Sequence, residues 1–427
     1  MERFDAIVVG AGLAGGAAAL ALGRAGKRTL LLGQPTSDAG FEAVGSGLLY
    51  CGHLAPLPLP EFLRASEERH LSEIRWVVLR PRGSASVDFR DPAWEAPSST
   101  AYAVSRSQIQ SWLLQAAETA GVEIRREALV EGQVSGGSRV ASGVRVGGTN
   151  IEAPVTVLTR RGDRSQRSSN GGPASDDHVI EETFQLSSAV IERRFSLGRR
   201  QGIVFQFLPD IPPASPPLRA FLTTRREQLG LGVILHASEQ TAPDSILPSA
   251  LASLRSHPTV APLLREANSL GTHLYTIPSG NGAPEVSSGA GVLCAGDVLG
   301  FPIFDGIRPI RLDIELRTGW AAGTAVSKIS ATQSTPRTLR QAYRTELRTT
   351  GLLEEAARMR STLRHVTWNS DLAARYPFFL DRLLHEMMSE TGAPKRSVRS
   401  TVRQVQKETR LGVATLVRDA LRTGGSL

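Results

Sequence analysis

The chain has 427 residues, 41% of them hydrophobic, and this length suits two or three domains that share a sizeable core. No apolar run reaches the roughly 18–20 residues that span a bilayer, and a first strand from about Phe4 leaves no room for a signal peptide. We therefore expect a cytoplasmic protein, with membrane contact no more than peripheral. The net charge of +8 does not indicate a nucleic-acid partner, because only four of the 49 basic residues are lysine and no nucleic-acid-binding motif accompanies them.

The first predicted element is a βαβ unit over residues 4–34, with a glycine turn between its first strand and its helix. In the pattern GxGxxG, the first glycine permits a tight turn, the second lets the backbone approach a pyrophosphate, and the third lets helix and strand pack closely. The free N–H groups at the start of the helix favour an anion. The predicted dinucleotide site comprises Gly10, Gly12, Leu13, Ala14 and Gly15.

The end of the second strand departs from this pattern. In dinucleotide-binding folds of this kind, an Asp or Glu at that position binds a ribose hydroxyl. Here the position is Gly33, followed by Gln34, whose amide can still offer a hydrogen bond. Loss of one neutral hydrogen bond costs about 0.5–1.5 kcal/mol, against roughly 12 kcal/mol for a nanomolar ligand. We therefore expect the dinucleotide to bind more weakly but still to bind.

The middle of the chain predicts a helix and then mostly strands. Residues 105–125 carry apolar side chains on one helical face and end at Gly121, and residues 160–177 are polar enough for a loop. The apolar runs between 179 and 236, the run AVIERRFSL at 189–197 included, are interpreted as strands. The later predicted elements are a helix at 246–256, a strand and turn at 289–301, a helix at 313–329, and further helices beyond 335.

A second glycine turn decides which dinucleotide is expected. Gly296 and Asp297 follow an apolar strand and precede a helix rich in small residues. This pairing resembles the FAD-binding family related to glutathione reductase and to aromatic hydroxylases. The resemblance implies that Asp297 contacts the ribityl chain, that Arg106 at the start of the 105–125 helix contacts the dinucleotide, and that Gly47 and Val130 line the FAD site.

The order of several weaker motifs narrows the resemblance. The runs GSGLLYCG, RRFSL, TTRREQLGLGVIL, SHPTVAPLL and HLYTIPSG precede the Gly-Asp turn in a sequence that resembles the electron-transfer-flavoprotein:quinone oxidoreductases. Their shorter FixC-type relatives match best, with geranylgeranyl reductases as cousins. An iron–sulfur cluster needs four thiolates, and the chain has only Cys51 and Cys294, which agrees with the shorter relatives and leaves no predicted metal site.

The resemblance implies an α/β fold with a Rossmann-like FAD-binding domain, a β-sheet-rich substrate domain and a helical C-terminal region. The expected boundaries are 1–55, 100–165 and 270–330 for the FAD-binding domain, 56–99 and 178–269 for the substrate domain, and 335–427 for the helical region.

Other positions differ from the family. Arg161-Gly162 stands where the wider flavoprotein class often has Asp-Gly, and Ile310-Arg311-Leu312-Asp313 stands where the relatives have an Arg-Gly-x-Asp-like run. Cys51 either packs as a small apolar residue or faces a substrate, and His53 either is structural or acts as an acid or base. The sequence identifies no catalytic residue.

The expected activity is FAD-dependent oxidation or redox tailoring of a small organic or acyl-type substrate, with electrons passed to a protein, a quinone or oxygen. Two alternatives stay open: a flavoprotein that works on a carrier-protein-bound intermediate of a biosynthetic assembly line, and an isoprenoid double-bond reductase.

The C-terminal tail, residues 395–422, carries apolar residues near helical spacing beneath a basic face. It either packs on the body or docks an acidic redox or carrier partner.

Overall fold

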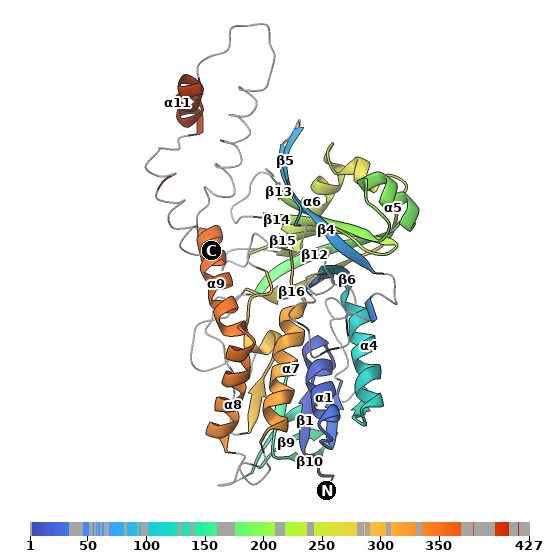
Figure 1. The fold of residues 1–427 in the computed structure, drawn as a ribbon, viewed down its shortest axis with the longest axis vertical. Helices are drawn as coiled ribbons and strands as arrows, with labels where there is room; N and C mark the ends of the chain where they lie inside the picture. Colours follow the sequence, from blue (N-terminus) through green and yellow to red (C-terminus); the bar gives the residue numbers. More distant parts are fainter. Residues whose placement is uncertain are drawn as a thin grey trace.

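We describe the protein from a computed structural model. The structure describes residues 2–33, 46–50, 68–80, 83–91, 101–126, 130–136, 141–159, 176–209, 218–236, 243–279, 291–304, 309–329, 335–368 and 398–409, with Leu54, Leu57, Leu59, Phe62, Leu63, Trp94, Val286, Phe379 and Val417. The fold is mixed α/β, as the sequence predicts, and its helices and sheets form the layers seen in Figure 1.

A five-stranded parallel sheet lies at the N-terminal end of the fold (Figure 1), in the order β17-β11-β1-β2-β7. Its strands are β1 (Ala6–Val9), β2 (Thr29–Leu32), β7 (Glu123–Arg125), β11 (Thr156–Leu158) and β17 (Val292–Cys294). Every residue of β1, β2 and β17 is buried. Such continuous apolar runs are typical of parallel strands that are covered on both faces.

Helices cover one face of this sheet and a small antiparallel sheet covers the other. On the helical face, α1 (Leu13–Arg24) packs between α4 (Arg106–Thr119) and α7 (Asp313–Ser327). On the other face, β10 (Thr149–Ala153), β9 (Ala141–Val146) and β8 (Val130–Gly136) form a three-stranded sheet. The two faces of the sheet pack into separate hydrophobic clusters. Ala6 and Val8 of β1 belong to the cluster on the helical face, and Ile7 and Val9 belong to the cluster on the other face.

A nine-stranded sheet forms the second half of the fold, in the order β16-β12-β15-β14-β13-β4-β6-β3, with β5 paired to β4. Its strands are β3 (Ser46–Tyr50), β4 (Arg69–Arg80), β5 (Gly83–Phe89), β6 (Ala101–Ser105), β12 (Asp176–Gln185), β13 (Gln201–Pro209), β14 (Leu218–Thr224), β15 (Gln228–Leu235) and β16 (Asn268–Pro278). Its outer face packs on α5 (Ser188–Phe195) and α6 (Pro243–Ser256), and η4 (Ala261–Leu264) follows. Its inner face packs on the FAD-domain side, within the main hydrophobic cluster.

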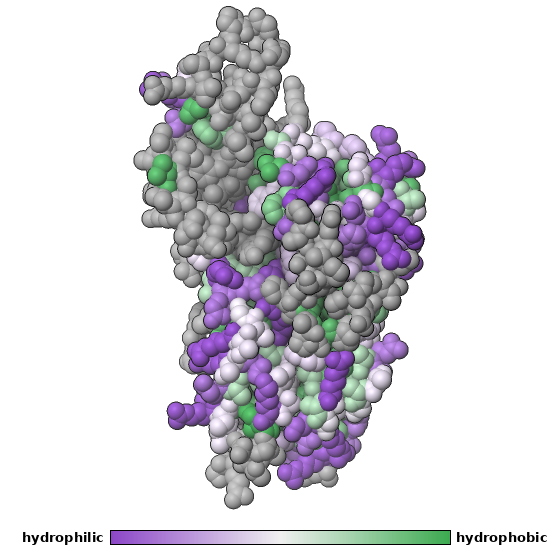
Figure 2. All heavy atoms as spheres, in the orientation of Figure 1, coloured by the Kyte–Doolittle hydropathy of each residue, from purple (hydrophilic) through white to green (hydrophobic). Residues whose placement is uncertain are grey.

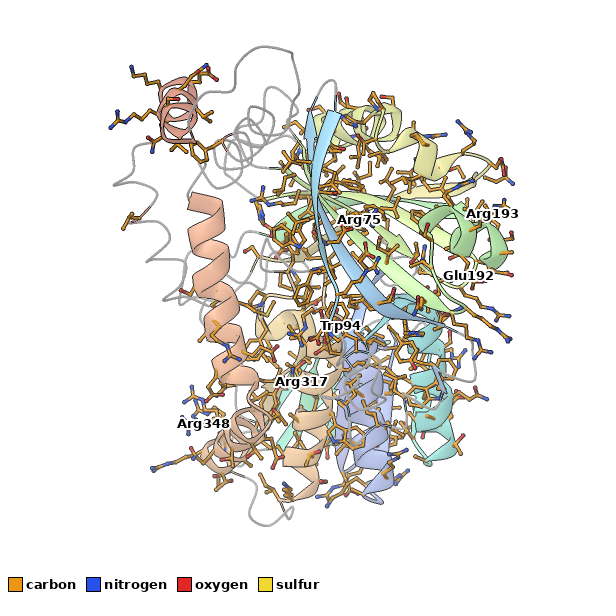
Figure 3. The ribbon with its side chains drawn as sticks, turned by 45° about the horizontal axis from the view of Figure 1, so that its top comes forward. Arg75, Trp94, Glu192, Arg193, Arg317 and Arg348 are labelled. Carbon is orange, nitrogen blue, oxygen red and sulfur yellow. The ribbon has the colours of Figure 1, made fainter. Side chains whose placement is uncertain are left out.

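The strand predicted at 189–197 is wrong, because these residues form α5. Ile191 and Phe195 are both buried and lie one helical turn apart, whereas a strand would have turned them to the same face as exposed Arg193. The buried guanidinium of Arg69 holds α5 against the sheet through Glu192, at 3.2 Å, and through the carbonyl oxygen of Ser188. Figure 3 labels Glu192 and Arg193 on this helix, and hydrophilic side chains gather over it in Figure 2.

Three further helices follow in the described part of the C-terminal region: α8 (Pro336–Thr349), α9 (Leu352–Trp368) and α11 (Val398–Thr409). Thr335 begins α8 with a reciprocal capping box to Thr338, and Leu339, Tyr343 and Leu347 form its buried stripe. In Figure 1, α8 lies beside α7, and α9 continues from α8 toward the nine-stranded sheet. Within the described residues, no helix is both long and apolar enough to cross a membrane.

Candidate functional site

The N-terminal glycine turn has no room for side chains. Gly10 has φ 108°, which favours glycine, and a Cβ on Gly15 would overlap the carbonyl oxygen of Gly10. The hydroxyl of Thr159, next to β11, donates to the carbonyl oxygens of Val9 and Gly10 at 3.0 Å each. Gly12 caps α1 without a side-chain hydrogen bond, so the first N–H groups of the helix are available to an anion.

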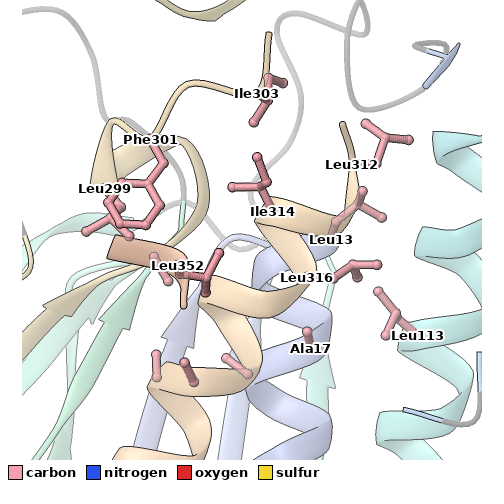
Figure 4. Close-up of a cluster of buried hydrophobic side chains, with 14 of the residues drawn as sticks. Leu13, Ala17, Leu113, Leu299, Phe301, Ile303, Leu312, Ile314, Leu316 and Leu352 are labelled. Atoms are coloured by element: carbon pink, nitrogen blue, oxygen red, sulfur yellow. The ribbon is translucent and has the colours of Figure 1, made fainter. Parts of the chain in front are cut away.

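Leu13 and Ala14 serve this turn through their backbone, because their side chains are buried in the core. Leu13 packs toward Leu316 of α7 in the apolar cluster of Figure 4. The two helices approach so closely that a Cβ on Gly319 would overlap the carbonyl oxygen of Ala14.

The Gly-Asp turn meets the first turn at the start of α1. Gly296 begins the short helix η5 (Gly296–Leu299) with φ 62°, and a Cβ there would lie 2.7 Å from the Cβ of Ala14. Its N–H donates to the Thr318 hydroxyl at 3.0 Å, so Thr318 of α7 holds the turn. The two glycine turns, far apart in sequence, thus form one cradle, and Asp297 lies at its rim, partly buried.

Gly33 ends β2 beside this cradle. A Cβ at Gly33 would lie 3.3 Å from the Cβ of Ala11, and its N–H donates to the carbonyl oxygen of Arg125 at 2.9 Å. The position predicted to bind ribose is therefore next to the glycine turn. Five residues that the sequence singled out lie outside the described residues: Gln34, Cys51, His53, Arg161 and Gly162.

Gly47 lies in β3 where this strand contacts the segment between the Gly-Asp turn and α7. A Cβ at Gly47 would lie 2.8 Å from the carbonyl oxygen of Ile310. The N–H of Leu48 donates to that same oxygen at 2.7 Å, and Leu312 donates to the carbonyl oxygen of Leu48. Val130, at the start of β8, packs against the cluster on the far face of the parallel sheet.

Arg106 is buried at the first position of α4 and forms a two-pronged ion pair with Glu315 of α7, at 2.5 and 2.6 Å. Both side chains are about 3% exposed. The contact of Arg106 with FAD stays a prediction. In such a contact the guanidinium would bind both Glu315 and FAD.

Arg311, which replaces a glycine of the family, belongs to a buried charge cluster. The cluster consists of Arg311, Asp313, Arg317 and Glu355. Arg311 binds Asp313 at 2.6 Å and also Glu355, and Arg317 binds Glu355 at 2.6 Å. Although burial opposes ionisation, the guanidiniums of Arg311 and Arg317 lower the pKa of Glu355 to about 2. Arg317 lies on α7 where α9 passes (Figure 3). The bulk of Arg311 is thus directed toward α9.

The inner face of the nine-stranded sheet carries a buried polar cluster beside β3. Glu181 of β12 is fully buried and accepts from the Ser46 hydroxyl at 2.7 Å and from the Tyr275 hydroxyl at 2.9 Å. Burial, together with the charge of Glu181, raises the pKa of Tyr275 well above its ordinary value. This cluster joins β3, at one end of the strand order, to β12 and β16 at the other end.

Sequence reasoning missed a second polar pair on this face. His236 follows β15, and its Nδ1 lies 3.0 Å from Oδ2 of Asp177 in β12. The two residues are 59 positions apart, and neither belongs to a motif, so no local signal marks them.

A polar cavity of about 490 Å³ lies at the opposite end of β12. Its lining comprises Glu68, Ser105, Ser107, Gln108, Thr183, Gln185, Arg225, Arg226, Glu227, Gln228, Leu270 and His273. Burial raises the pKa of Glu68, although Arg225 opposes this. Because none of the cradle glycines lines this cavity, it is distinct from the glycine cradle.

The residues present fit FAD. The cradle excludes Cβ atoms at Gly15 and Gly296, Gly10 has a positive φ that favours glycine, and the free N–H groups of α1 face the cradle. The described residues contain no group of His, Cys, Asp or Glu side chains that could hold a metal ion.

Comparison with known proteins shows the family to which this chain belongs. No family model matches the chain. The probable electron transfer flavoprotein-quinone oxidoreductase YdiS of Escherichia coli (strain K12) is 27% identical over 100% of this chain and 99% of its own length. Protein FixC of Salmonella typhi is 31% identical over 76% of this chain and 77% of its own length. The chain belongs to the FixC family.

A solved structure supports the fold of this FixC-family chain. The geranylgeranyl bacteriochlorophyll reductase-like protein of Thermoplasma acidophilum has a TM-score of 0.64, with 98% of this chain and 99% of that protein covered. At 14% identity, this likeness concerns the fold alone. The FixC-family chain is an FAD-dependent oxidoreductase, and the predicted cofactor, enzyme class and family are confirmed.

Proposed function

We propose that this FixC-family protein oxidises a small organic or acyl-type substrate and passes the electrons to an electron-transfer protein or a quinone. One observation carries the proposal. The chain that leaves the Gly-Asp turn, with Phe301, Ile303 and Phe304, packs in the same cluster as Ile234 and Ile277 of the sheet's inner face. A substrate bound on this face therefore lies next to the cofactor cradle. The similarity to YdiS, a probable electron transfer flavoprotein-quinone oxidoreductase, supports a quinone as the first acceptor to test.

Bound FAD supplies the two-electron redox chemistry, and the chain supplies binding, orientation and exclusion of water. The glycine cradle orients the dinucleotide along the start of α1. The apolar side chains of the inner face exclude water from the substrate, which protects the transferred electrons from side reactions.

The test uses the purified holoenzyme, reduced anaerobically with dithionite and mixed with decylubiquinone in a stopped-flow absorbance experiment. We expect reoxidation of the flavin by decylubiquinone to be faster than reoxidation by oxygen. In the opposite half-reaction, butyryl-coenzyme A probes the acyl-type substrate. Reduced enzyme that ignores decylubiquinone but reduces geranylgeranyl diphosphate would instead support the isoprenoid reductase. Reduction only by a substrate loaded on a carrier protein would support the assembly-line enzyme.

A further inference from the structure

His236 is a buried histidine with one nitrogen held and one nitrogen available. It is 4% exposed, and its Nδ1 lies 3.0 Å from Asp177. Its Nε2 is buried and has no hydrogen-bond partner in the part of the chain that the structure describes. A buried polar nitrogen without a partner is destabilising, so a merely structural histidine would be expected to satisfy both nitrogens. The arrangement leaves Nε2 ready for a ligand.

The imidazole also lies at the cofactor side of the sheet. Its ring stacks on Phe304, with ring centroids 6.0 Å apart and an interplanar angle of 19°. Phe304 belongs to the chain that connects the Gly-Asp turn to α7. Asp177 pairs with Ile277 of β16, whose side chain is part of the same inner-face cluster as Phe304. His236 is therefore on the face where a substrate meets the cradle.

The strand registers place two charged residues on the same inner face as His236. Asp177 reaches it from β12, and Arg219 of β14, paired with Ile234, lies one inner-face position along the sheet. Burial lowers the pKa of Arg219 to about 10, so it remains a cation at neutral pH. From β16 and from the Gly-Asp segment, the facing residues are the apolar Ile277 and Phe304.

We propose that His236 is the proton-transfer residue of this oxidoreductase and that Asp177 is its positioning residue. The proposal rests on the proposed function. During oxidation, a substrate of the type H–C–X–H loses a hydride from carbon to oxidised FAD and a proton from X to Nε2, and a C=X bond forms. When a quinone is reduced, it receives a hydride equivalent from reduced FAD and one proton from the imidazolium, which gives the hydroquinone. The imidazole is then neutral again and can accept the proton of the next substrate molecule.

The first experiment compares two acceptors with reduced holoenzyme. Decylubiquinone needs protons, whereas ferricyanide takes electrons alone. We expect His236→Gln to slow decylubiquinone reduction about a hundredfold, to abolish its pH dependence between about pH 5 and 8, and to leave the ferricyanide rate within about twofold. His178→Gln is the matched control, because His178 lies one position from Asp177 on the outer face of β12. Asp177→Asn should lose activity that Asp177→Glu largely keeps.

A quinone rate and pH profile in His236→Gln that match those of the wild type and His178→Gln would overturn the proposal. Equal losses with decylubiquinone and ferricyanide would also overturn it, because they would indicate a structural role.

A second measurement needs no acceptor and separates this inference from the proposed function. The midpoint potential of bound FAD is measured against pH by spectroelectrochemistry in the wild type, His236→Gln and His178→Gln. We expect the potential to follow a different pH dependence only in His236→Gln, between about pH 5 and 8. Identical curves would overturn the role of His236. A wild-type enzyme that fails with decylubiquinone would contradict the quinone acceptor, while this comparison would still decide whether His236 exchanges protons at the cofactor.

Discussion

At the scale of single residues, the replacement of a glycine by Arg311 changes the surroundings of the cofactor segment. Its guanidinium lies 4.7 Å from the centre of the Tyr50 ring and is bound by Asp313 and Glu355. Asp313 and Glu355 raise the pKa of Arg311 further although burial lowers it, so the residue is a permanent cation. This cation is neutralised inside the protein by Asp313 and Glu355, which explains how the buried segment tolerates it.

Glu355→Gln should destabilise the protein by about 3 kcal/mol near neutral pH, because two buried guanidiniums lose a counter-charge. The pKa of Glu355 is lowered from its ordinary 4.5 to about 2, so its contribution is complete above pH 4.5 and is lost as the pH falls toward 2. Chemical denaturation from about pH 7 to about pH 3 checks this, since the difference between wild type and variant should shrink in acid. The control is Glu354→Gln at the exposed neighbouring position. Equal stabilities at neutral pH would contradict the prediction.

Asp297→Ala should lose FAD far more readily than Cys51→Ala, because Asp297 lies at the junction of the two glycine turns. Released FAD is measured after gel filtration of each purified variant. Asp244→Ala, at an exposed site on α6, controls for the loss of a carboxylate. Equal flavin content in the Asp297 and Cys51 variants would refute the role assigned to the Gly-Asp turn.

The two glycine turns could be predicted from the sequence because each is a local pattern that adjoins a strand and a helix. The polar pairs on the inner face could not. Ser46 and Glu181 are 135 positions apart and lie on β3 and β12, which are not paired strands, so only the packing of the whole inner face brings them together. The Arg106–Glu315 pair, across 209 positions, is likewise invisible to local reasoning. Such pairs depend on tertiary packing, which cannot be inferred from a single sequence.

At the scale of elements, helices were predicted well where an apolar stripe and an end signal coincide. The helix expected at 105–125 is α4, with Ile109 and Leu113 buried, and Gly121 follows it with φ 84°. The exception is α5, a short helix whose Val and Ile residues favour strands by composition. Its two buried residues, Ile191 and Phe195, show that spacing was the better guide there.

Gly319→Ala should destabilise the fold by about 1–3 kcal/mol and weaken FAD binding, because the added methyl group would force α7 away from α1. Thermal unfolding of the apo and FAD-bound forms measures both effects. Gly198→Ala is the control, since a Cβ there is exposed and meets only the flexible side chain of Gln201. If both variants unfold at the wild-type temperature, the close approach of the helices is not needed.

At the scale of the whole molecule, strands from distant parts of the chain share each layer. β3, β6 and β16 fall within the ranges expected for the FAD-binding domain, yet all three pair in the nine-stranded sheet. The domain boundaries stay a prediction, and residues from both expected domains pack together in the main hydrophobic cluster.

The basic C-terminal tail, residues 395–422, is a candidate docking surface for an electron-transfer partner. Within the tail, α11 exposes Arg403 and buries Val405. We predict that reversing Arg399, Arg403 and Arg410 to Glu slows electron exchange with an acidic electron-transfer flavoprotein at low salt, while FAD content and the ferricyanide rate stay unchanged. The defect should fade at high salt, where the charges are screened. Unchanged partner rates, or loss of FAD, would mean that the tail is structural.

The buried charge cluster also bears on how the chain folds while it is being synthesised. Glu355 comes from α9, after every strand and helix that surrounds the cofactor. Until α9 leaves the ribosome, Arg311 and Arg317 lack this counter-charge inside an apolar interior, which is costly. We therefore expect the segment that carries Arg311 and Arg317 to reach its buried position only once α9 can pack against it.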